Sequence, residues 1–327
     1  MAVTRTLEEA RRGGREPRSF RARLRYGDQA AHLITLLFAS VIVLITALLV
    51  LELYRGSALT RAKFGWRFLY SGTWDPVFGN FGALPFVYGT LVTSALALLI
   101  AVPLGVGAAI FLAELAPPRV SNVLTFVIEL LAAVPSVIYG LLAIFTLVPL
   151  LRSTVEPALK EWLGFLPFFQ GPTYGVGLLA AGLILAIMIV PFIISISRDV
   201  LQAVPMEMRE AALALGATRW ESTWSVVLPS ARAGILGSIF LAMARALGET
   251  MAVTMVIGND PKISASLFAP GASIAAAIAN EFTEATGDLY VSALIELGLV
   301  LFLLTIILNG LARLLILGTQ RKGTTHP

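Results

Sequence analysis

The chain has 327 residues, of which 57% are hydrophobic and only 13% are charged, and its net charge is +4. Soluble domains carry about 25% charged residues, so this composition excludes a soluble globular protein and predicts an integral membrane protein. The absence of cysteine excludes disulfides, thiolate metal sites and cysteine nucleophiles. The two histidines, His32 and His326, have no second ligand at a suitable spacing, so we expect no metal site.

The first 31 residues are polar and contain eight arginines. A signal peptide has a shorter basic region and a shorter apolar one, so we interpret residues 1–31 as a cytoplasmic arm that attracts anionic lipid headgroups. The small net charge of the chain describes topology and does not predict a nucleic-acid partner.

Six long apolar segments follow, each of about 20 or more residues, which is enough to cross a bilayer as a helix. The sequence therefore predicts an all-α polytopic membrane domain over residues 32–317 and a short cytoplasmic tail over 318–327. The predicted spans are 33–53, 87–113, 122–151, 175–197, 233–258 and 289–312.

Loops are expected at 54–86, 152–173 and 259–288, the last with a short surface helix near 273–284. Prolines within the spans (Pro103, Pro135 and Pro191) predict bends. The distribution of Lys and Arg sets the orientation, because cytoplasmic loops carry an excess of both. With the N-terminus inside, the inner segments hold 16 of the 24 cations and the outer loops hold 7. Both termini and the segment before the fifth span are therefore predicted to be cytoplasmic.

That segment, residues 204–229, has the pattern of a helical hairpin. Pro205 suits the start of a helix, and Gly216 suits its end. Thr218 and Glu221 form a T-x-x-E capping box for a second helix, which we expect to end at Pro229. A folded hairpin between two membrane spans predicts a docking surface.

Two charges, Arg245 and Glu249, lie within the fifth predicted span. An ionised group at the bilayer centre costs about 3 kcal/mol, so such residues usually face the bundle interior or a water-filled path. Their spacing of four predicts a shared helical face. One interpretation is a structural ion pair. The other is an anion path, because the fork of Arg245 matches the oxygens of phosphate or sulfate. Glu249 would then hold the guanidinium or accept a hydrogen bond from a protonated oxyanion.

Two further carboxylates, Glu129 and Glu296, lie within predicted spans, where each is a candidate partner for Arg245 or for another subunit. Glu52 and Glu114 lie near span ends and are expected to reach the interface. The chain has no G-x-x-x-x-G-K-[ST] phosphate loop, no H-E-x-x-H motif and no nucleophile–base pair. We therefore expect no catalytic residue and no cofactor in this chain, and an enzyme is the weakest interpretation.

The hairpin sequence carries a resemblance. Glu210, Ala211, Ala212, Gly216, Leu228 and Pro229 match the EAA-x3-G-x9-I-x-L-P pattern of bacterial ABC importer permeases, with Val226 in place of Ile. The segment from Ala244 to Asn259 resembles the phosphate-specific PstC family of these permeases, and a looser resemblance covers all six spans. The resemblance implies the architecture of a type I ABC importer permease in a bacterial plasma (inner) membrane.

The resemblance also implies partners. They are a PstA-like permease that completes the pore, a PstB-like ATPase dimer that binds ATP and Mg and grips the hairpin, and a PstS-like protein that delivers inorganic phosphate. Glu210 to Pro229 would couple the ATPase to the pore, and Arg245 and Glu249 would lie in the phosphate path. Two alternatives remain open: a permease for another oxyanion such as sulfate or molybdate, and a membrane sensor or scaffold for phosphate status.

Overall fold

The computed structural model describes residues 18–321, and the chain divides into two compact units, Met1–Arg55 and Gly56–Pro327. Both are helical, with no β-strand within the described residues. Six helical segments there are long and apolar enough to cross a membrane, so the all-α six-span prediction is confirmed. They are Ala31–Gly56, Leu84–Leu115, Ser136–Leu163, Leu178–Gln202, Arg219–Leu247 and Asp288–Leu314.

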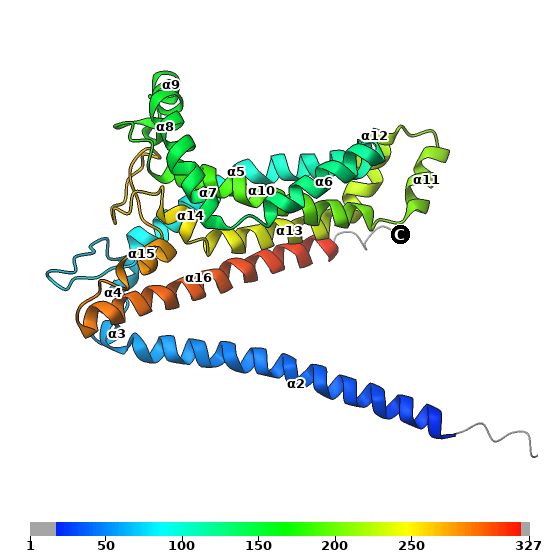
Figure 1. Ribbon diagram of the computed structural model, residues 1–327, viewed down its shortest axis with the longest axis horizontal. Helices are drawn as coiled ribbons and strands as arrows, with labels where there is room; N and C mark the ends of the chain where they lie inside the picture. Colours follow the sequence, from blue (N-terminus) through cyan, green and yellow to red (C-terminus); the bar gives the residue numbers. More distant parts are fainter. Residues whose placement is uncertain (1–17, 322–327) are drawn as a thin grey trace, which may run out of the picture. The chain divides into compact units, whose positions relative to one another are not determined.

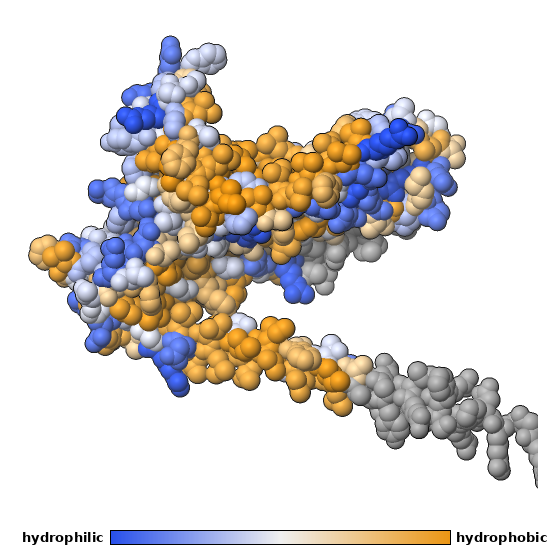
Figure 2. All heavy atoms as spheres, in the orientation of Figure 1, coloured by the Kyte–Doolittle hydropathy of each residue, from blue (hydrophilic) through white to orange (hydrophobic). Residues whose placement is uncertain are grey.

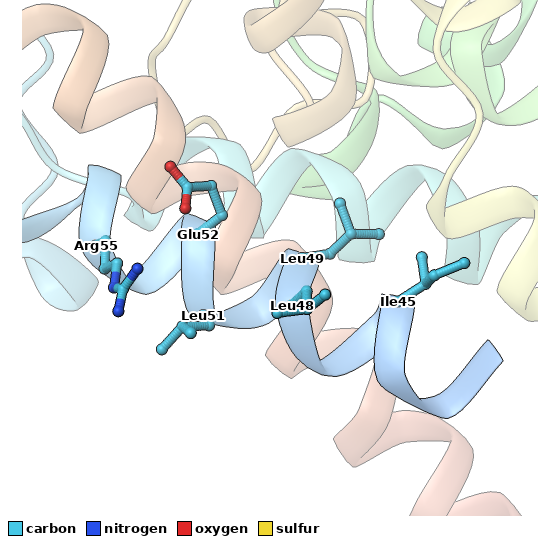
Figure 3. A pocket seen from close by; sticks show the side chains of 6 residues that line it. All are labelled: Ile45, Leu48, Leu49, Leu51, Glu52 and Arg55. Atoms are coloured by element: carbon cyan, nitrogen blue, oxygen red, sulfur yellow. The ribbon is translucent and has the colours of Figure 1, made fainter. Parts of the chain in front are cut away.

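The first unit is built on one helix, α2 (Arg18–Gly56), whose membrane-spanning part begins at Ala31. Residues 1–17 of the predicted basic arm lie outside the described residues, and the backbone of 18–31 continues the helix. Within this unit Glu52 projects from the same side of α2 as Leu49 and Ile45, whereas Leu51 projects from the other side (Figure 3). This arrangement follows from helical geometry, because residues four and seven apart share a face.

The second unit contains the other five spans (Figure 1). Its helices are α3 (Ala58–Phe64), α4 (Arg67–Tyr70), α5 (Leu84–Ile110), α6 (Pro118–Ala132), α7 (Ser136–Leu142), α8 (Val148–Leu150), α9 (Glu156–Leu163), α10 (Leu178–Gln202), α11 (Met206–Ala214), α12 (Arg219–Ser222), α13 (Leu228–Leu247), α14 (Met251–Thr254), α15 (Ile274–Glu281) and α16 (Asp288–Arg321). Apolar side chains cover the middle of the long helices, and hydrophilic ones gather where α11 and α12 lie (Figure 2).

The core of this unit is the packing of α10 against α5 and α13. Small residues bring the backbones close together. A Cβ at Gly105 of α5 would lie 2.7 Å from the Ile193 side chain of α10, and one at Gly182 of α10 would lie 2.5 Å from Leu96 of α5. Close approach through glycine is typical of membrane helices, which gain van der Waals contact but little hydrophobic driving force on association.

Prolines shape the long helices through π-helical turns. Four such turns, 111–115, 143–147, 151–155 and 223–227, each end two residues before a proline. In each case the residue immediately before the proline donates its N–H to the carbonyl five residues earlier, as Leu228 does to Thr223. The wider turn moves aside the carbonyl that would otherwise meet the proline ring. Helices therefore continue through Pro149, Pro157 and Pro229.

The third predicted span, 122–151, is wrong as a single helix. Helix α6 ends at Ala132, and α7 starts at Ser136 after Pro135, whose backbone is extended (ψ 139°). Proline disfavours the helical conformation of the residue before it, which explains the break. The span that is long and apolar enough runs from Ser136 to Leu163, so much of the predicted loop 152–173 is helical. Helix α6 packs along α10 (Figure 1).

The predicted helix near 273–284 is present as α15, with the Ser273 hydroxyl accepting a hydrogen bond from the Ala276 N–H. The prediction that it lies on the surface is wrong. Ile274 and the three alanines that follow it are buried against α5, α14 and α16. The run of alanines allows this close packing, because a methyl group fills little space between helices.

Candidate functional site

The first helix of the predicted hairpin has the expected ends. Helix α11 begins after Pro205, and Gly216 follows it in the left-handed region (φ 90°). Glycine takes this conformation without strain, and its N–H donates to the Leu213 carbonyl at 3.0 Å. The capping box is also formed, because Thr218 and Glu221 each accept a hydrogen bond from the other's backbone N–H. These local predictions are confirmed.

The sequence pattern predicted that the second helix ends at Pro229, and this prediction is wrong. Helices α12 and α13 are joined by the π-helical turn 223–227, so one helical run extends from Arg219 to Leu247. Pro229 lies in the first turn of α13, where its missing N–H is tolerated because of that wider turn. The hairpin and the fifth span are therefore mechanically continuous.

An ion pair fastens the hairpin to the end of α5. The Arg209 guanidinium of α11 donates to both carboxylate oxygens of Glu114, at 2.7 Å and 3.2 Å. It also donates to the carbonyls of Leu201, at 2.8 Å, and Val204. Only 13% of the Arg209 side chain and 9% of the Glu114 side chain are exposed. The Glu114 carboxylate, which we expected to reach the membrane interface, is therefore largely buried against Arg209.

The residues that match the EAA pattern are mostly accessible. Glu210, Ala211, Gly216 and Pro229 are exposed, whereas Ala212 and Leu228 are half-buried. Large apolar side chains accompany them. They are Met206, Leu213, Leu215, Trp220 and Trp224, with Leu215 90% exposed. The rings of Trp220 and Trp224 stack at 5.9 Å between centroids. Exposed apolar residues on a polar, anchored hairpin are typical of a protein-docking surface.

Arg245 lies in the last turn of α13 and is exposed in this chain. Its guanidinium carbon is 5.6 Å from the centre of the Phe192 ring on α10, within the range of a cation–π contact. Within residues 18–321 the structure records no ion pair for Arg245, so the guanidinium keeps its donors for another group. An aromatic face orients the cation without neutralising it, which suits reversible anion binding.

The spacing of four predicted that Glu249 and Arg245 share a helical face, and this prediction is wrong. Helix α13 ends at Leu247, and Gly248 and Glu249 form the turn before α14. The Glu249 carboxylate accepts a hydrogen bond from the Ala252 N–H at 3.3 Å, which supports the first turn of α14. Glu249 is half-buried and lies near the end of the fifth span, outside its helix.

Neither of the other two carboxylates pairs with Arg245. Glu129 is exposed on α6. That helix is separate from the helical run Ser136–Leu163, which forms the third span. Glu296 is buried in α16, and its Oε2 lies 3.7 Å from the Nε of Arg61 in α3. Ser57 also hydrogen-bonds to Glu296. No local pattern predicted the Arg61–Glu296 pair, because 235 positions separate the two residues in the numbering.

Two clefts lie elsewhere on the described residues. One, of about 350 Å³, is a groove lined by Ile45, Leu48, Leu49, Leu51, Glu52 and Arg55, all on α2 (Figure 3). A groove on one apolar helix has too few converging polar groups to select a polar substrate. The other lies among α3, α4 and the loop that follows them. Residues 18–321 contain no group of three His, Asp or Glu side chains placed to hold a metal ion.

Comparisons with known proteins agree with the fold. The model of the family described as binding-protein-dependent transport system inner membrane component matches residues 101–320. The phosphate transport system permease protein PstC of Mesorhizobium japonicum is 48% identical over 89% of this chain and 90% of its own length. PstC of Pasteurella multocida is 49% identical over 88% of this chain and 91% of its own length.

Solved structures are similar in fold at low sequence identity. A bacterial ABC transporter involved in the import of the acidic polysaccharide alginate has a TM-score of 0.56 and 16% identity, over 90% of this chain and 98% of its own. An inward-facing MetNI methionine ABC transporter has a TM-score of 0.53 and 15% identity, over 76% of this chain and 99% of its own.

Proposed function

We propose that this chain, which belongs to the family of inner membrane components of binding-protein-dependent transport systems, is the permease subunit of an importer for inorganic phosphate. Membership of that family supports the role of a permease subunit. The fold is that of a type I ABC importer permease. A permease subunit is not itself catalytic. The observation that carries phosphate as the substrate is the 48–49% identity with PstC proteins over almost the whole length of both chains.

Arg245 supplies the substrate contact in this proposal. Its guanidinium is permanently charged, is oriented by the Phe192 ring, and has no ion-pair partner among residues 18–321. A planar fork of this kind donates two parallel hydrogen bonds to a phosphate. Glu249 lies four residues further along the chain and accepts a hydrogen bond from a protonated oxygen of the same anion. The rest of the path is contributed by a PstA-like sister permease.

The hairpin couples this path to ATP hydrolysis. A PstB-like ATPase dimer, which binds ATP and Mg, grips the exposed residues Glu210, Ala211 and Gly216 and the apolar side chains beside them. Because the helical run Arg219–Leu247 contains both the second hairpin helix and Arg245, a tilt of the hairpin reaches the path directly. The Arg209–Glu114 pair transmits the same movement to α5.

The orientation follows from the distribution of cations. The excess of Lys and Arg on the hairpin side supports a cytoplasmic location for both termini and the hairpin. The family's description as an inner membrane component supports the plasma membrane of a bacterium. The loops between spans one and two, three and four, and five and six then face outward. There a PstS-like binding protein delivers phosphate.

The proposal is tested by uptake of radiolabelled phosphate into liposomes that contain the assembled transporter, with sulfate as the competing anion. Arg245→Gln removes the fork and is expected to lower uptake at least about 10-fold, since a charge-assisted hydrogen bond contributes about 1.5–3 kcal/mol. Assembly with the ATPase is expected to be unchanged. Arg313→Gln removes a similar charge from an exposed site on α16 and serves as the control.

Three results would contradict parts of this proposal. Normal phosphate uptake by the Arg245→Gln transporter removes Arg245 from the path. Transport of sulfate in preference to phosphate by the unaltered transporter assigns the permease to another oxyanion. Failure of the unaltered transporter to move either anion, with intact assembly, supports a sensor or scaffold instead.

A further inference from the structure

A basic cleft lies in the second unit, in the segment between the first two spans. It has a volume of about 190 Å³ and is lined by Lys63, Phe64, Arg67, Ser71, Thr73, Asn80 and Phe81. None of these seven residues is acidic, whereas two carry a positive charge and three carry a hydroxyl or an amide. The cleft is smaller than the pockets of about 300–1,000 Å³ that bind drug-sized ligands, so it suits a small anionic group.

Lys63 is held in place at the cleft. Its ammonium donates to the Gly79 carbonyl at 2.9 Å and lies 5.1 Å from the centre of the Phe64 ring. An ammonium has three donors, so this hydrogen bond leaves two for a ligand. The backbone turn that presents Gly79 is closed by the paired Asp75 and Asn80. Lys63 therefore has a defined position and unused donors.

Arg67 supplies a second cation with its full set of donors. Within residues 18–321 the structure records no hydrogen bond or ion pair for its side chain. The nearest acidic residue in the loop, Asp75, does not line the cleft, and its carboxylate accepts from the N–H groups of Val77 and Phe78. The Arg67 charge is thus not neutralised by a neighbouring carboxylate.

The hydroxyls complete a set of donors that suits an oxyanion. Ser71 and Thr73 share a hydrogen bond of 2.9 Å between their oxygens, and Asn80 is a third polar residue of the lining. A guanidinium fork, an ammonium and neutral donors are groups that bind the oxygens of a phosphate. A neutral amide ligand would leave both positive charges uncompensated.

The place of these cations in the chain is also unexpected. Loops on the outer side of a membrane protein carry few Lys and Arg, because cations there oppose the topology. Yet Arg61, Lys63 and Arg67 lie within seven residues of one another in a loop that the charge distribution places outside. Arg61 is accounted for by Glu296, whereas neither Lys63 nor Arg67 has a carboxylate partner among residues 31–314, whose side chains the structure describes. A negatively charged ligand explains the presence of Lys63 and Arg67 in this loop.

We propose that this cleft is a second phosphate-group site, separate from Arg245, in which Arg67 holds two oxygens and Lys63 a third. The phosphate group is either free inorganic phosphate or the headgroup of an outer-leaflet lipid. Exposed aromatic side chains beside the cleft, Trp66 and Tyr70, are typical of the membrane interface and bring lipid headgroups within reach. The site's chemistry is independent of the proposed transport, and only its outward position rests on the proposed orientation.

The site is tested by protection of Lys63 from an amine-reactive reagent, measured by peptide mass spectrometry on the full chain. In maltoside micelles, whose headgroups carry no phosphate, added inorganic phosphate is expected to slow labelling of Lys63. Lys160 is the internal reference, because it is exposed and also donates to a loop carbonyl (Gly171, 2.9 Å) but lines neither cleft. Labelling of Lys160 is expected to be unchanged by phosphate.

Arg67→Gln is the test variant, and Arg152→Gln is the matched control from another exposed position on the same predicted side. Loss of one charge-assisted hydrogen-bond partner is expected to raise the phosphate concentration needed for protection about 10-fold in Arg67→Gln only. A second arm replaces added phosphate with nanodiscs that contain phosphatidylglycerol. Protection of Lys63 in that arm alone, lost in Arg67→Gln, identifies the ligand as a lipid headgroup.

The proposal is overturned if Lys63 is labelled at the same rate in every arm. It is also overturned if phosphate protects Lys160 as much as Lys63. The same holds if phosphate protects Lys63 of the Arg67→Gln variant as well as it protects Lys63 of the unaltered chain. The labelling uses neither ATP nor a partner subunit. Failure of this site therefore leaves the uptake experiment on Arg245 intact, and failure of phosphate uptake leaves this measurement intact.

Discussion

Arg209 and Glu114 form a two-pronged ion pair that fastens the exposed hairpin to the end of α5, with hydrogen bonds of 2.7 Å and 3.2 Å. Three parallel interactions hold Arg209 in place: the carboxylate, the Leu201 carbonyl and the Val204 carbonyl. A force applied to α11 therefore reaches α5 as well as α13. In a transporter driven by an external ATPase, such a rigid connection lets one docking surface move two membrane helices together.

Replacing one partner of this pair is expected to destabilise the chain more than replacing both. Glu114→Gln leaves the Arg209 charge largely buried and unpaired, which costs about 3 kcal/mol by comparison with other buried pairs. The double variant Glu114→Gln/Arg209→Gln removes both charges and is expected to recover part of that loss. Thermal unfolding of these two variants and of the single variant Arg209→Gln in detergent gives the coupling energy. Additive effects would show that the pair does not fasten the hairpin.

Gly216 is expected to tolerate alanine better than proline. Nothing lies within 4 Å of the position of an added Cβ, so alanine suffers only from the left-handed backbone (φ 90°), at about 1 kcal/mol. Proline cannot adopt this φ and has no N–H for the Leu213 carbonyl. We expect Gly216→Ala to co-purify with the ATPase and to transport, and Gly216→Pro to uncouple ATP hydrolysis from uptake. Equal transport by the two variants would argue against a docking role for this turn.

A charge reversal on the exposed face of α11 tests the same surface without backbone strain. Glu210 is exposed and makes no side-chain hydrogen bond or ion pair within the part of the chain that the structure describes, so Glu210→Lys is expected to leave the melting temperature of the chain unchanged. Its effect is expected only in the assembled transporter, as loss of coupling between ATPase rate and uptake. Glu207→Lys, an exposed position on the same helix, is the comparison. Unaltered coupling in Glu210→Lys would remove Glu210 from the interface.

Phe192 is expected to act as a positioning residue for Arg245. Phe192→Leu keeps the apolar volume but removes the ring face beneath the guanidinium, which contributes about 1 kcal/mol, or roughly 5-fold in affinity. We expect a higher phosphate concentration for half-maximal uptake at an unchanged maximal rate. Phe169→Leu, which removes a ring that contacts Phe268 instead, is the control. An unchanged concentration dependence in Phe192→Leu would show that the ring does not orient Arg245.

Two replacements separate the charge of Glu249 from its capping role. Glu249→Gln keeps an oxygen that accepts from the Ala252 N–H, whereas Glu249→Ala does not. The thermal stability of Glu249→Gln is therefore expected to be unchanged, and that of Glu249→Ala to fall by about 1 kcal/mol. Uptake is expected to fall in both, because both lack the carboxylate. Normal uptake by Glu249→Gln would reduce Glu249 to a cap for α14.

Several features of the chain were predictable because they are local. The long apolar runs, the Thr218–Glu221 capping box and the turn at Gly216 depend on residues within one or two helical turns. Their conformations are set by hydrogen bonds that short segments make with themselves. The EAA pattern belongs to the same class, since all of its residues lie within one hairpin.

The effect of a proline on its helix was not predictable from the neighbouring residues alone. The helix breaks at Pro135 but continues through Pro229, although both prolines are exposed and both are followed by serine. The difference is a π-helical turn, which leaves an extra residue bulging from the helix. Whether neighbouring helices accept that bulge is a property of packing. The misplaced third span and the supposed end of the hairpin at Pro229 both follow from this.

The sequence by itself determined that the chain crosses a membrane six times, that a capped hairpin precedes the fifth span, and that cations favour one side. Each of these depends on composition or on contacts within a few residues. Only the tertiary structure decided which charges meet. It paired Glu114 with Arg209 and Glu296 with Arg61, left Arg245 against an aromatic ring, and moved Glu249 out of the helix. Ion pairs between helices depend on how the backbones pack, and the small residues that set this packing carry no mark of their partners.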